Sequence, residues 1–454
     1  MHRFHYSTNI VPNSEINPVY KSYALQNVKE LPQIRRLSEE QVFDIEVVGH
    51  VLPFKTSSYV VEELIDWSNI PNDPMFVLNF PQRDMLKSHH FNELSKLLRE
   101  GASPEKIKRT AYNIRLQLNP HPAGQMDHNI PSLKGKKLCG IQHKYRETVL
   151  FFPLQGQTCH AYCTFCFRWP QFIGINKLKF GMREIDILIR YVRRHPEVTD
   201  ILFTGGDPLV MTTKVLTSYI DPLIEADLPN VQSIRIGTKS LTYWPYRFLT
   251  DPDADELLAL FEKVVNKGKH LAFMAHLNHP NELKTEAVKR AIARIRNTGA
   301  QIRTQSPLLA HINDSPDLWT EMWNNQVRLG CIPYYMFIAR DTGAQHFFRV
   351  PLGRAWQIYQ KAYQNVSGLS RTVRGPSMSA APGKVEILGV NDIAGEKVFV
   401  LRMLQGRNPD WAMRPFFAAY DKNAVWLDKL RPAFRKKRFF FQEKSHPKAA
   451  FQSF

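Results

Sequence analysis

The sequence predicts an α/β fold in which a parallel sheet curls into a barrel or part of one. From about residue 147 onward, short β-rich runs alternate with amphipathic helices at intervals of roughly 30 residues, as in repeated β-α units. Glycines also stand where a helix should end before the next strand, at Gly268, Gly299 and Gly330. Polar clusters follow several predicted strands, and in parallel folds of this kind the chemistry lies at those strand ends.

The repeating part is expected to contain six strands. Their ranges are 147–152, 199–204, 231–237, 270–276, 300–305 and 332–338. Between the strands, apolar residues recur at helical spacing, for example at Ile185, Leu188, Ile189 and Val192.

Two further regions flank the repeating part. Residues 1–140 are expected to form a mainly helical N-terminal region, in which the helical stretch 91–118 breaks at 101–104. Residues 381–454 are expected to contain a β-hairpin, formed by 385–389 and 398–402, and a basic tail. The middle region, 141–380, therefore holds the predicted barrel.

The composition is that of a globular protein with excess positive charge. The net charge of +18 predicts an anionic partner, and much of it lies at 431–438, just before three consecutive phenylalanines. Nucleic acid is not the expected partner, because no RNA-binding motif accompanies the charge. No apolar run approaches the ~18 residues of a membrane helix, and the first ten residues lack a signal segment. A cytoplasmic location without membrane association is therefore expected.

Three of the five cysteines lie in one run with the spacing C-x3-C-x2-C, at Cys159, Cys163 and Cys166. Three thiolates on one loop can hold three irons of a [4Fe–4S] cluster and leave the fourth iron open. S-adenosylmethionine (SAM) is the molecule known to bind the open iron at this spacing. A structural zinc site is the alternative, with His160 or Cys139 as a fourth ligand. A disulfide framework is disfavoured by the odd number of cysteines, and free thiols fit a reducing cytoplasm.

Several ordered segments resemble the lysine 2,3-aminomutase family of radical SAM enzymes, over most of the range 143–384. They are His-Lys-Tyr at 143–145, the cysteine loop, Thr-Gly-Gly-Asp-Pro-Leu at 204–209, Arg-Ile-Gly at 235–237, His-Leu-Asn-His-Pro-Asn-Glu at 276–282, Gln-Ser at 305–306, Asn-Asp at 313–314, Pro-Tyr-Tyr at 333–335 and Ala-Pro-Gly-Lys at 381–384. The resemblance implies a partial (β/α)6 TIM-like radical SAM barrel, with a helical N-terminal extension and a C-terminal hairpin and tail.

The resemblance also assigns residues to cofactors. The residues it implies around SAM are Gly205, Gly206 and Asp207, which hold its amino acid end, and His276, Asn278 and Gln305. It implies that Lys384 carries pyridoxal 5′-phosphate (PLP) as an internal aldimine, with Tyr145 beside it. The chain departs from the family in having fewer glycines before Lys384, and in having Thr148 where the family has an arginine.

The substrate pocket departs most from the family. Arg168 matches the arginine that binds the substrate α-carboxylate, a task that suits a bidentate guanidinium. Arg340 stands where lysine-specific members have an aspartate, and Asp341 is adjacent. A cation at this position predicts an acidic substrate, glutamate or aspartate. If Asp341 faces the pocket instead, lysine or another amino acid is predicted.

The implied function is that of an amino acid 2,3-aminomutase. Such an isomerase moves the α-amino group to the β-carbon by means of a 5′-deoxyadenosyl radical and a PLP aldimine, and needs an electron donor such as flavodoxin or ferredoxin. No cysteine follows Cys331, so the family's zinc-bridged assembly is not expected, while a homo-oligomer stays open. The alternatives are a PLP-independent radical SAM enzyme, an RNA-modifying radical SAM enzyme and a zinc-bound interaction protein.

Overall fold

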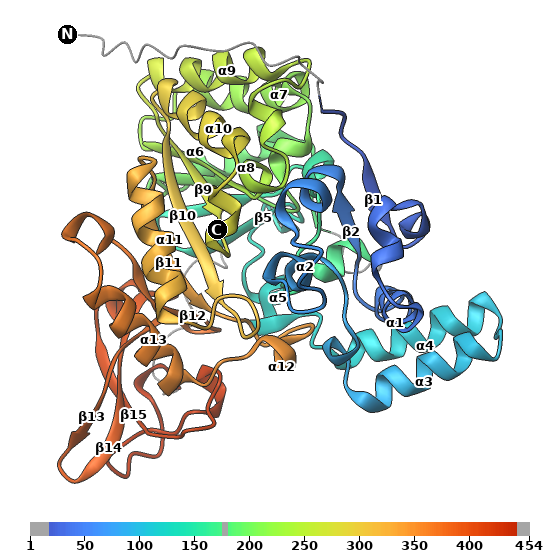
Figure 1. Ribbon diagram of the computed structural model, residues 1–454. Coiled ribbons are helices and arrows are strands. Elements are labelled where there is room, and N and C mark those ends of the chain that lie inside the picture. Colours follow the sequence, from blue (N-terminus) through green and yellow to red (C-terminus); the bar gives the residue numbers. More distant parts are fainter. Residues whose placement is uncertain (1–17, 175–179, 443–454) are drawn as a thin grey trace.

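The computed structural model describes residues 18–174 and 180–442, and its centre is one mixed sheet of eleven strands (Figure 1). Seven neighbouring strands run parallel, and they are β6 (Thr148–Phe151), β7 (Asp200–Phe203), β8 (Ser233–Thr238), β9 (His270–His276), β10 (Gln301–Leu308), β11 (Ile332–Ile338) and β12 (Arg374–Ser379). Antiparallel strands extend both ends of this run, namely β5 (Ile141–Tyr145) beside β6, and β13 (Gly383–Ile393), β14 (Glu396–Gly406) and β15 (Pro415–Ala419) beyond β12.

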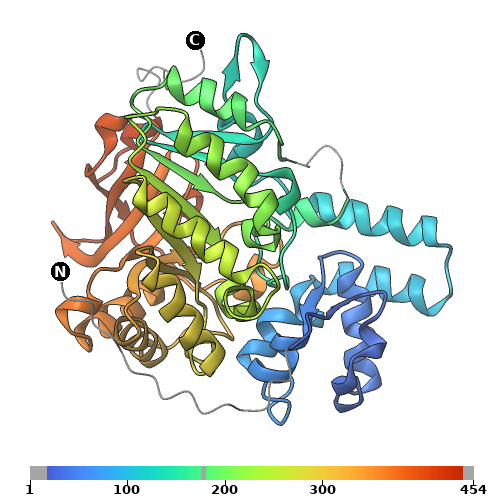
Figure 2. The same cartoon turned by 90° about the horizontal axis from the view of Figure 1, so that it is seen from above.

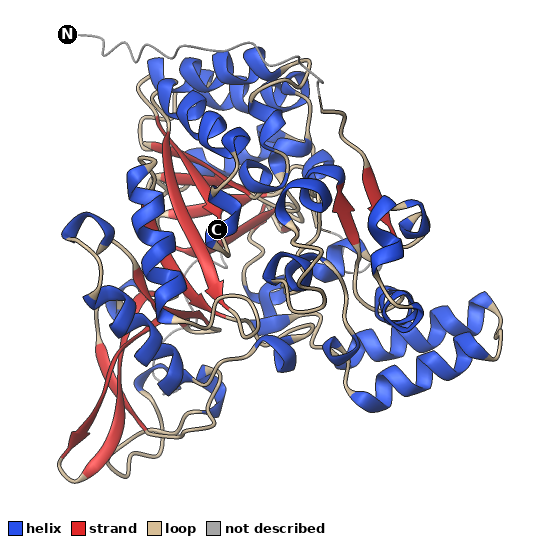
Figure 3. Cartoon of the chain, viewed as in Figure 1, coloured by secondary structure: helices blue, strands red, loops and turns tan. Residues whose placement is uncertain are grey.

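Helices connect the parallel strands. The longer ones are α6 (Ile185–Arg193), α7 (Thr213–Glu225), α9 (Ala254–Asn266), α10 (Glu286–Asn297), α11 (Pro316–Arg328) and α13 (Leu352–Gln364), while α8 (Ser240–Tyr243) and α12 (Gln345–Phe348) are single turns. The longer helices lie along the outside of the sheet (Figure 3). Their apolar faces turn inward: α6 buries Ile185, Leu188, Ile189 and Val192, the four residues whose spacing predicts it. The predicted helix-ending glycines at 268, 299 and 330 all have positive φ, between 75° and 86°.

The described N-terminal region is mainly helical. It contains α1 (Glu39–Gly49), α2 (Pro74–Asn79), α3 (Ser88–Arg99), α4 (Pro104–Gln117) and α5 (Gln125–His128), with the short strands β1 (Ser22–Ala24), β2 (Lys55–Ser57), β3 (Ser132–Leu133) and β4 (Lys136–Lys137). The predicted break at 101–104 separates α3 from α4, where the Ser103 side chain accepts a hydrogen bond from the Lys106 backbone. Figure 2 shows these two helices as a projecting hairpin.

The two ends of the parallel run lie close together in space. In the sheet order β5 and β12 are seven steps apart, which in a flat sheet would separate them by roughly 34 Å at about 4.8 Å per step. However, Lys144 of β5 donates a hydrogen bond from Nζ to the carbonyl oxygen of Ala380, directly after β12. Lys384 Nζ also lies 5.8 Å from the centroid of the Tyr145 ring. The sheet is therefore strongly curved, and its concave side encloses side chains from both ends.

All six predicted parallel strands are present, within a few residues of the expected bounds. The seventh, β12, is missed because its sequence Arg-Gly-Pro-Ser-Met-Ser is rich in residues that disfavour strands. The predicted hairpin is β13 and β14, but both strands are longer than expected, at 11 residues each.

The basic and aromatic tail packs on the C-terminal sheet. Phe439, Phe440 and Phe441 all contact the Phe416 ring of β15, at centroid distances of 5.5, 5.7 and 5.6 Å. The three phenylalanines therefore complete a local core. Among the described helices, none combines the length and the hydropathy that a membrane crossing requires.

Candidate active site

The cysteine loop, residues 153–166, follows β6 and is held by the N-terminal region. Lys55 Nζ donates a 2.8 Å hydrogen bond to the Cys159 carbonyl oxygen. The Tyr162 backbone N–H donates a 2.7 Å hydrogen bond to the Lys55 carbonyl oxygen. The Thr164 hydroxyl donates to the Val77 carbonyl oxygen at the end of α2, at 2.8 Å. The loop's shape therefore depends on contacts made more than eighty residues earlier in the chain.

Burial raises the pKa of all three thiols in this loop. The pKa of Cys166 rises to about 12, through burial and then through the charge of Cys163. The pKa of Cys159 is raised by burial, then by the Asp207 carboxylate and the other two thiols. Three such thiols can ionise together only beside a strong positive centre, and iron bound as a cluster provides one. Within the described ranges, no three His, Cys, Asp or Glu side chains are spaced to bind a single metal ion.

The Gly205–Gly206 turn after β7 packs against the start of the cysteine loop. A Cβ on Gly206 would lie 2.3 Å from the Thr158 carbonyl oxygen, so only glycine fits there. Asp207 is buried, and its carboxylate accepts hydrogen bonds from the Thr238 hydroxyl at 2.8 Å and from the backbone of Lys239 and Leu209 at 2.8 and 3.0 Å. In this structure the Asp207 side chain therefore joins the ends of β7 and β8.

A buried ion pair joins the ends of β8 and β9. Lys239 Nζ pairs with the fully buried Glu282 and also donates to Asn278 Oδ1 at 2.9 Å. Glu282 in turn accepts from the backbone N–H groups of Asn278 and His279. Asn278 donates to the Ser306 hydroxyl at 3.0 Å, which extends the network to β10. Neither Lys239 nor Glu282 was among the expected site residues, although Glu282 ends the resembling segment 276–282 and Lys239 follows the segment 235–237 by two residues.

His276 and Gln305 meet at the neighbouring strand positions of β9 and β10. Gln305 Nε2 lies 2.8 Å from His276 Nε2, so the amide donates to a ring nitrogen that carries no proton. Burial lowers the pKa of His276 to about 3, and the charges of Lys239 and Arg168 add to this. The imidazole is therefore neutral at physiological pH and can accept or donate hydrogen bonds within the enclosed space.

Lys384 points from β13 into the concave side of the sheet. Its Nζ lies 4.1 Å from the centroid of the Tyr335 ring and 5.7 Å from that of Phe337, both on β11. Burial lowers the pKa of Lys384 to about 7, with further contributions from Arg374 and Arg235. An amine with this pKa is partly neutral near pH 7, which is the form that attacks an aldehyde.

The predicted substrate residues Arg168 and Arg340 lie near each other. The Arg340 guanidinium carbon is 5.0 Å from the Phe167 ring centroid, and that of Arg168 is 5.0 Å from the same ring. Burial lowers the pKa of Arg168 to about 10 and also lowers the pKa of Arg340. Arg340 Nε is buried and makes no hydrogen bond. Asp341 is held by Asn119, which donates to Asp341 Oδ2 at 3.2 Å, while Asp341 Oδ1 is buried without a partner.

Positive charge therefore dominates the enclosed space. Lys144, Arg168, Arg340 and Lys384 form no ion pair within the described residues, and burial is the first cause of the lowered pKa of each. Burying unpaired cations is costly, so a site of this kind is suited to anionic ligands. A phosphate group and amino acid carboxylates fit this requirement.

An enclosed site on a curved parallel sheet, with a three-cysteine loop and a buried low-pKa lysine, is that of a cofactor-dependent enzyme. No protein-family model matches the chain. A protein of Aquifex aeolicus named "Putative L-lysine 2,3-aminomutase" is 31% identical over 89% of this chain and 94% of its own length. The L-lysine 2,3-aminomutase of Acetoanaerobium sticklandii is 32% identical over 58% of this chain and 59% of its own. Among solved structures, a radical SAM methyltransferase from Sphaerobacter thermophilus gives a TM-score of 0.38 at 14% identity, over 63% of this chain and 93% of that chain.

The chain belongs to the lysine 2,3-aminomutase family. It is therefore a radical SAM isomerase of the aminomutase type, and its cofactors are a [4Fe–4S] cluster, SAM and PLP. The expected family membership is confirmed, while the roles of individual residues stay predictions.

The buried pair of Lys239 and Glu282 provides a test of how the site is held together. Lys239→Met should lower the free energy of unfolding by about 3–5 kcal/mol, because it leaves the Glu282 carboxylate buried and unpaired. Adding Glu282→Gln should recover part of this loss, since the amide oxygen can still accept from Asn278 and His279. Denaturant unfolding of both variants measures the effect, and a double variant that is less stable than the single one would contradict it.

Proposed function

We propose that the chain is an amino acid 2,3-aminomutase whose substrate carries a second carboxylate, as glutamate and aspartate do. The observation that supports it is the pair of buried guanidiniums, Arg168 and Arg340, which face the same Phe167 ring. Neither forms an ion pair with a described residue, although the Asp341 carboxylate lies beside Arg340. One cation suits the α-carboxylate, and the second suits a side-chain carboxylate. The curved run of parallel strands further supports the partial (β/α)6 barrel that the family resemblance implies.

The cysteine loop is the proposed cluster site. Cys159, Cys163 and Cys166 would hold three irons, and when the cluster and SAM are bound they supply a 5′-deoxyadenosyl radical. Gly205, Gly206 and Asp207 would shape the SAM site from the turn after β7, and His276, Asn278 and Gln305 from the ends of β9 and β10. The packing of Gly206 on Thr158 couples the turn to the cysteine loop, so both would hold their positions together.

Lys384 is the proposed attachment point for PLP, which when bound supplies a carbonyl carbon that holds the migrating nitrogen. The low pKa of Lys384 fits this role, as does the Tyr335 ring beside its Nζ. Tyr145 borders the same space, 5.8 Å from Lys384 Nζ. Lys144 and Arg374 are the nearby cations suited to a phosphate.

The remaining contribution of the chain is positioning. Arg168 would fix the α-carboxylate, and Arg340 the far end of the substrate, so that the β-carbon has one orientation toward the SAM site. The aromatic rings of Phe152 and Phe167 pack against Arg168, at 4.4 and 5.0 Å from its guanidinium carbon. These rings exclude water and fix the orientation of the guanidinium plane, which favours a bidentate contact with a carboxylate.

Lysine is the second candidate substrate. The relatives are named for L-lysine, and Asp341 has one buried carboxylate oxygen without a hydrogen bond. That oxygen could meet a distal ammonium if the substrate reaches the edge of the pocket. The charge of Arg340 favours the acidic substrate over lysine, because Arg340 lies beside Asp341 and would repel an ammonium group there.

The cluster assignment predicts the effect of removing single thiols. Replacing Cys159, Cys163 or Cys166 by Ala should abolish 5′-deoxyadenosine formation from SAM under reducing, anaerobic conditions, because the cube loses a ligand. Cys139→Ala is the matched control, since Cys139 is exposed and outside the loop, and it should retain full activity. Retention of SAM cleavage by all three loop variants would contradict the assignment.

The pKa of Lys384 predicts how PLP loading depends on pH. The neutral amine is the nucleophile, so the loading rate of the protein should rise up to a pH of about 7, the pKa of Lys384, and level off above it. An ordinary lysine would give a rate still rising near pH 10. Borohydride trapping followed by mass spectrometry should place the label on Lys384, with Lys397→Ala as an unaffected control. A label on another lysine would refute the attachment point.

The charge of Arg340 predicts the substrate. Arg340→Gln should lower kcat/KM for the acidic substrate by roughly a hundredfold, because a buried carboxylate loses its charged partner. Asp341→Asn is the matched control and should change kcat/KM much less. Assays of β-amino acid products from glutamate, aspartate and lysine measure both variants. Lysine as the best substrate, with Asp341→Asn as the damaging change, would reverse the assignment.

A further inference from the structure

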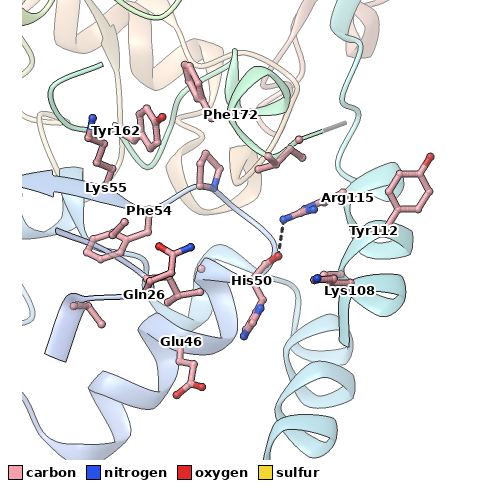
Figure 4. Close-up of a pocket in the computed structure, with 18 of the residues that line it drawn as sticks. Gln26, Glu46, His50, Phe54, Lys55, Lys108, Tyr112, Arg115, Tyr162 and Phe172 are labelled. Carbon is pink, nitrogen blue, oxygen red and sulfur yellow. Dashed lines mark hydrogen bonds between the residues drawn. The ribbon is translucent and has the colours of Figure 1, made fainter. Parts of the chain in front are cut away.

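A large hollow lies between the N-terminal region and the segment that carries the cysteine loop. Its volume is about 1230 Å³, and it is bordered by α1, α4, the segment before β2, and the cysteine loop itself. Figure 4 shows Lys55, Tyr162 and Phe172 along one side, and Lys108, Tyr112 and Arg115 of α4 along another. None of the residues assigned to SAM, PLP or substrate lines this hollow.

The hollow is strongly cationic. Its described lining includes five lysine and arginine side chains and one carboxylate, Glu46; the five are Lys29, Lys55, Lys108, Arg109 and Arg115. Within the described ranges none of the five forms an ion pair, and Arg115 instead donates to the carbonyl oxygens of His50 and Val51 at 2.7 and 2.9 Å. Burial lowers the pKa of His50, which keeps that imidazole neutral near pH 7. The hollow therefore attracts a partner of negative charge.

Two residues that line the hollow, Lys55 and Tyr162, connect it to the cysteine loop. Lys55 Nζ donates to the Cys159 carbonyl oxygen at 2.8 Å, and Tyr162 lies between Cys159 and Cys163 in the chain. The Tyr162 ring stacks on Phe172 with a centroid distance of 4.4 Å and an interplanar angle of 15°. A partner seated in the hollow would thus contact Tyr162 of the loop that carries the three cysteines.

We propose that this hollow is the docking surface for a small acidic one-electron carrier protein, of the flavin or iron–sulfur type, that reduces the cluster. The proposal rests on the proposed function, because it needs a cluster at Cys159, Cys163 and Cys166. One electron leaves the reduced carrier, and the same electron lowers the oxidation state of the cluster by one unit. Charge complementarity selects this partner: the carrier's acidic surface meets the cations of α4, and the interface is of the small, salt-sensitive kind typical of redox encounters.

Charge reversal on α4 tests the proposal. Lys108 and Arg109 are exposed and lie outside the catalytic site. In the reconstituted holoprotein, Lys108→Glu/Arg109→Glu should slow cluster reduction by flavodoxin hydroquinone by about tenfold or more at low salt. Reduction by dithionite should stay unchanged. Stopped-flow loss of the visible cluster absorbance measures both rates, and the milder Lys108→Gln/Arg109→Gln variant should give an intermediate slowing that guards against a folding defect.

Lys436→Glu/Lys437→Glu is the matched control, with the same change in net charge on the exposed C-terminal segment, and it should reduce at the wild-type rate. Equal slowing of both double variants, or none in either, would overturn the docking surface while leaving the cluster in place. A short single-stranded RNA whose binding is weakened by the α4 variant, with flavodoxin reduction unaffected, would assign the hollow to nucleic acid instead. If dithionite fails to bleach the visible absorbance of the wild-type protein, the protein holds no reducible cluster. That result would overturn the proposed function, and the docking surface with it.

Discussion

The curvature of the parallel sheet is the constraint on which the active site depends. A flat sheet would leave Tyr145 of β5 and Lys384 of β13 eight strands apart, but the hydrogen bond from Lys144 to Ala380 shows that the two ends of the parallel run meet. Side chains from β5, β8, β11 and β13 can therefore face one enclosed space. The ends of the neighbouring strands β8, β9 and β10 are joined by the buried network of Lys239, Glu282 and Asn278.

The enclosed space carries positive charge that the chain does not neutralise. Each unpaired buried cation costs stability, and the same burial lowers the pKa of Lys384. Anionic cofactors and substrates offset it when they bind, so ligand binding and folding stability are linked. Polar groups that could have neutralised the cations are used elsewhere: Asp207 joins β7 to β8, and Asp200 holds Arg235. The site is thus prepared for anions before any ligand arrives.

Much of this arrangement could be predicted from the sequence. Short β-rich runs that alternate with amphipathic helical patterns locate the six parallel strands and their helices, because these patterns reflect burial of apolar side chains. The cysteine spacing and the ordered segments at strand ends locate the proposed cofactor residues. Other features depend on packing between distant segments and leave no local signal. The strand β12 is one example, since its Gly-Pro-Ser sequence is tolerated only through its pairing with β11 and β13. The support of the cysteine loop by Lys55 and the internal packing of the phenylalanine tail are others. The sequence likewise leaves open which of Arg340 and Asp341 faces inward, because a shift of one residue reverses the charge of the pocket.

Transfer of deuterium from the substrate tests the central claim most directly. The wild-type holoprotein would be incubated anaerobically with SAM, reductant, PLP and amino acids deuterated at the β-carbon, and 5′-deoxyadenosine and SAM would then be analysed by mass spectrometry. If hydrogen is removed from the β-carbon of an amino acid with a second carboxylate, 5′-deoxyadenosine and SAM should carry deuterium after incubation with glutamate or aspartate. They should carry little or none after incubation with lysine. Deuterium from lysine alone would contradict the role of Arg340, and its absence with every amino acid, in a protein that still cleaves SAM, would contradict the aminomutase function.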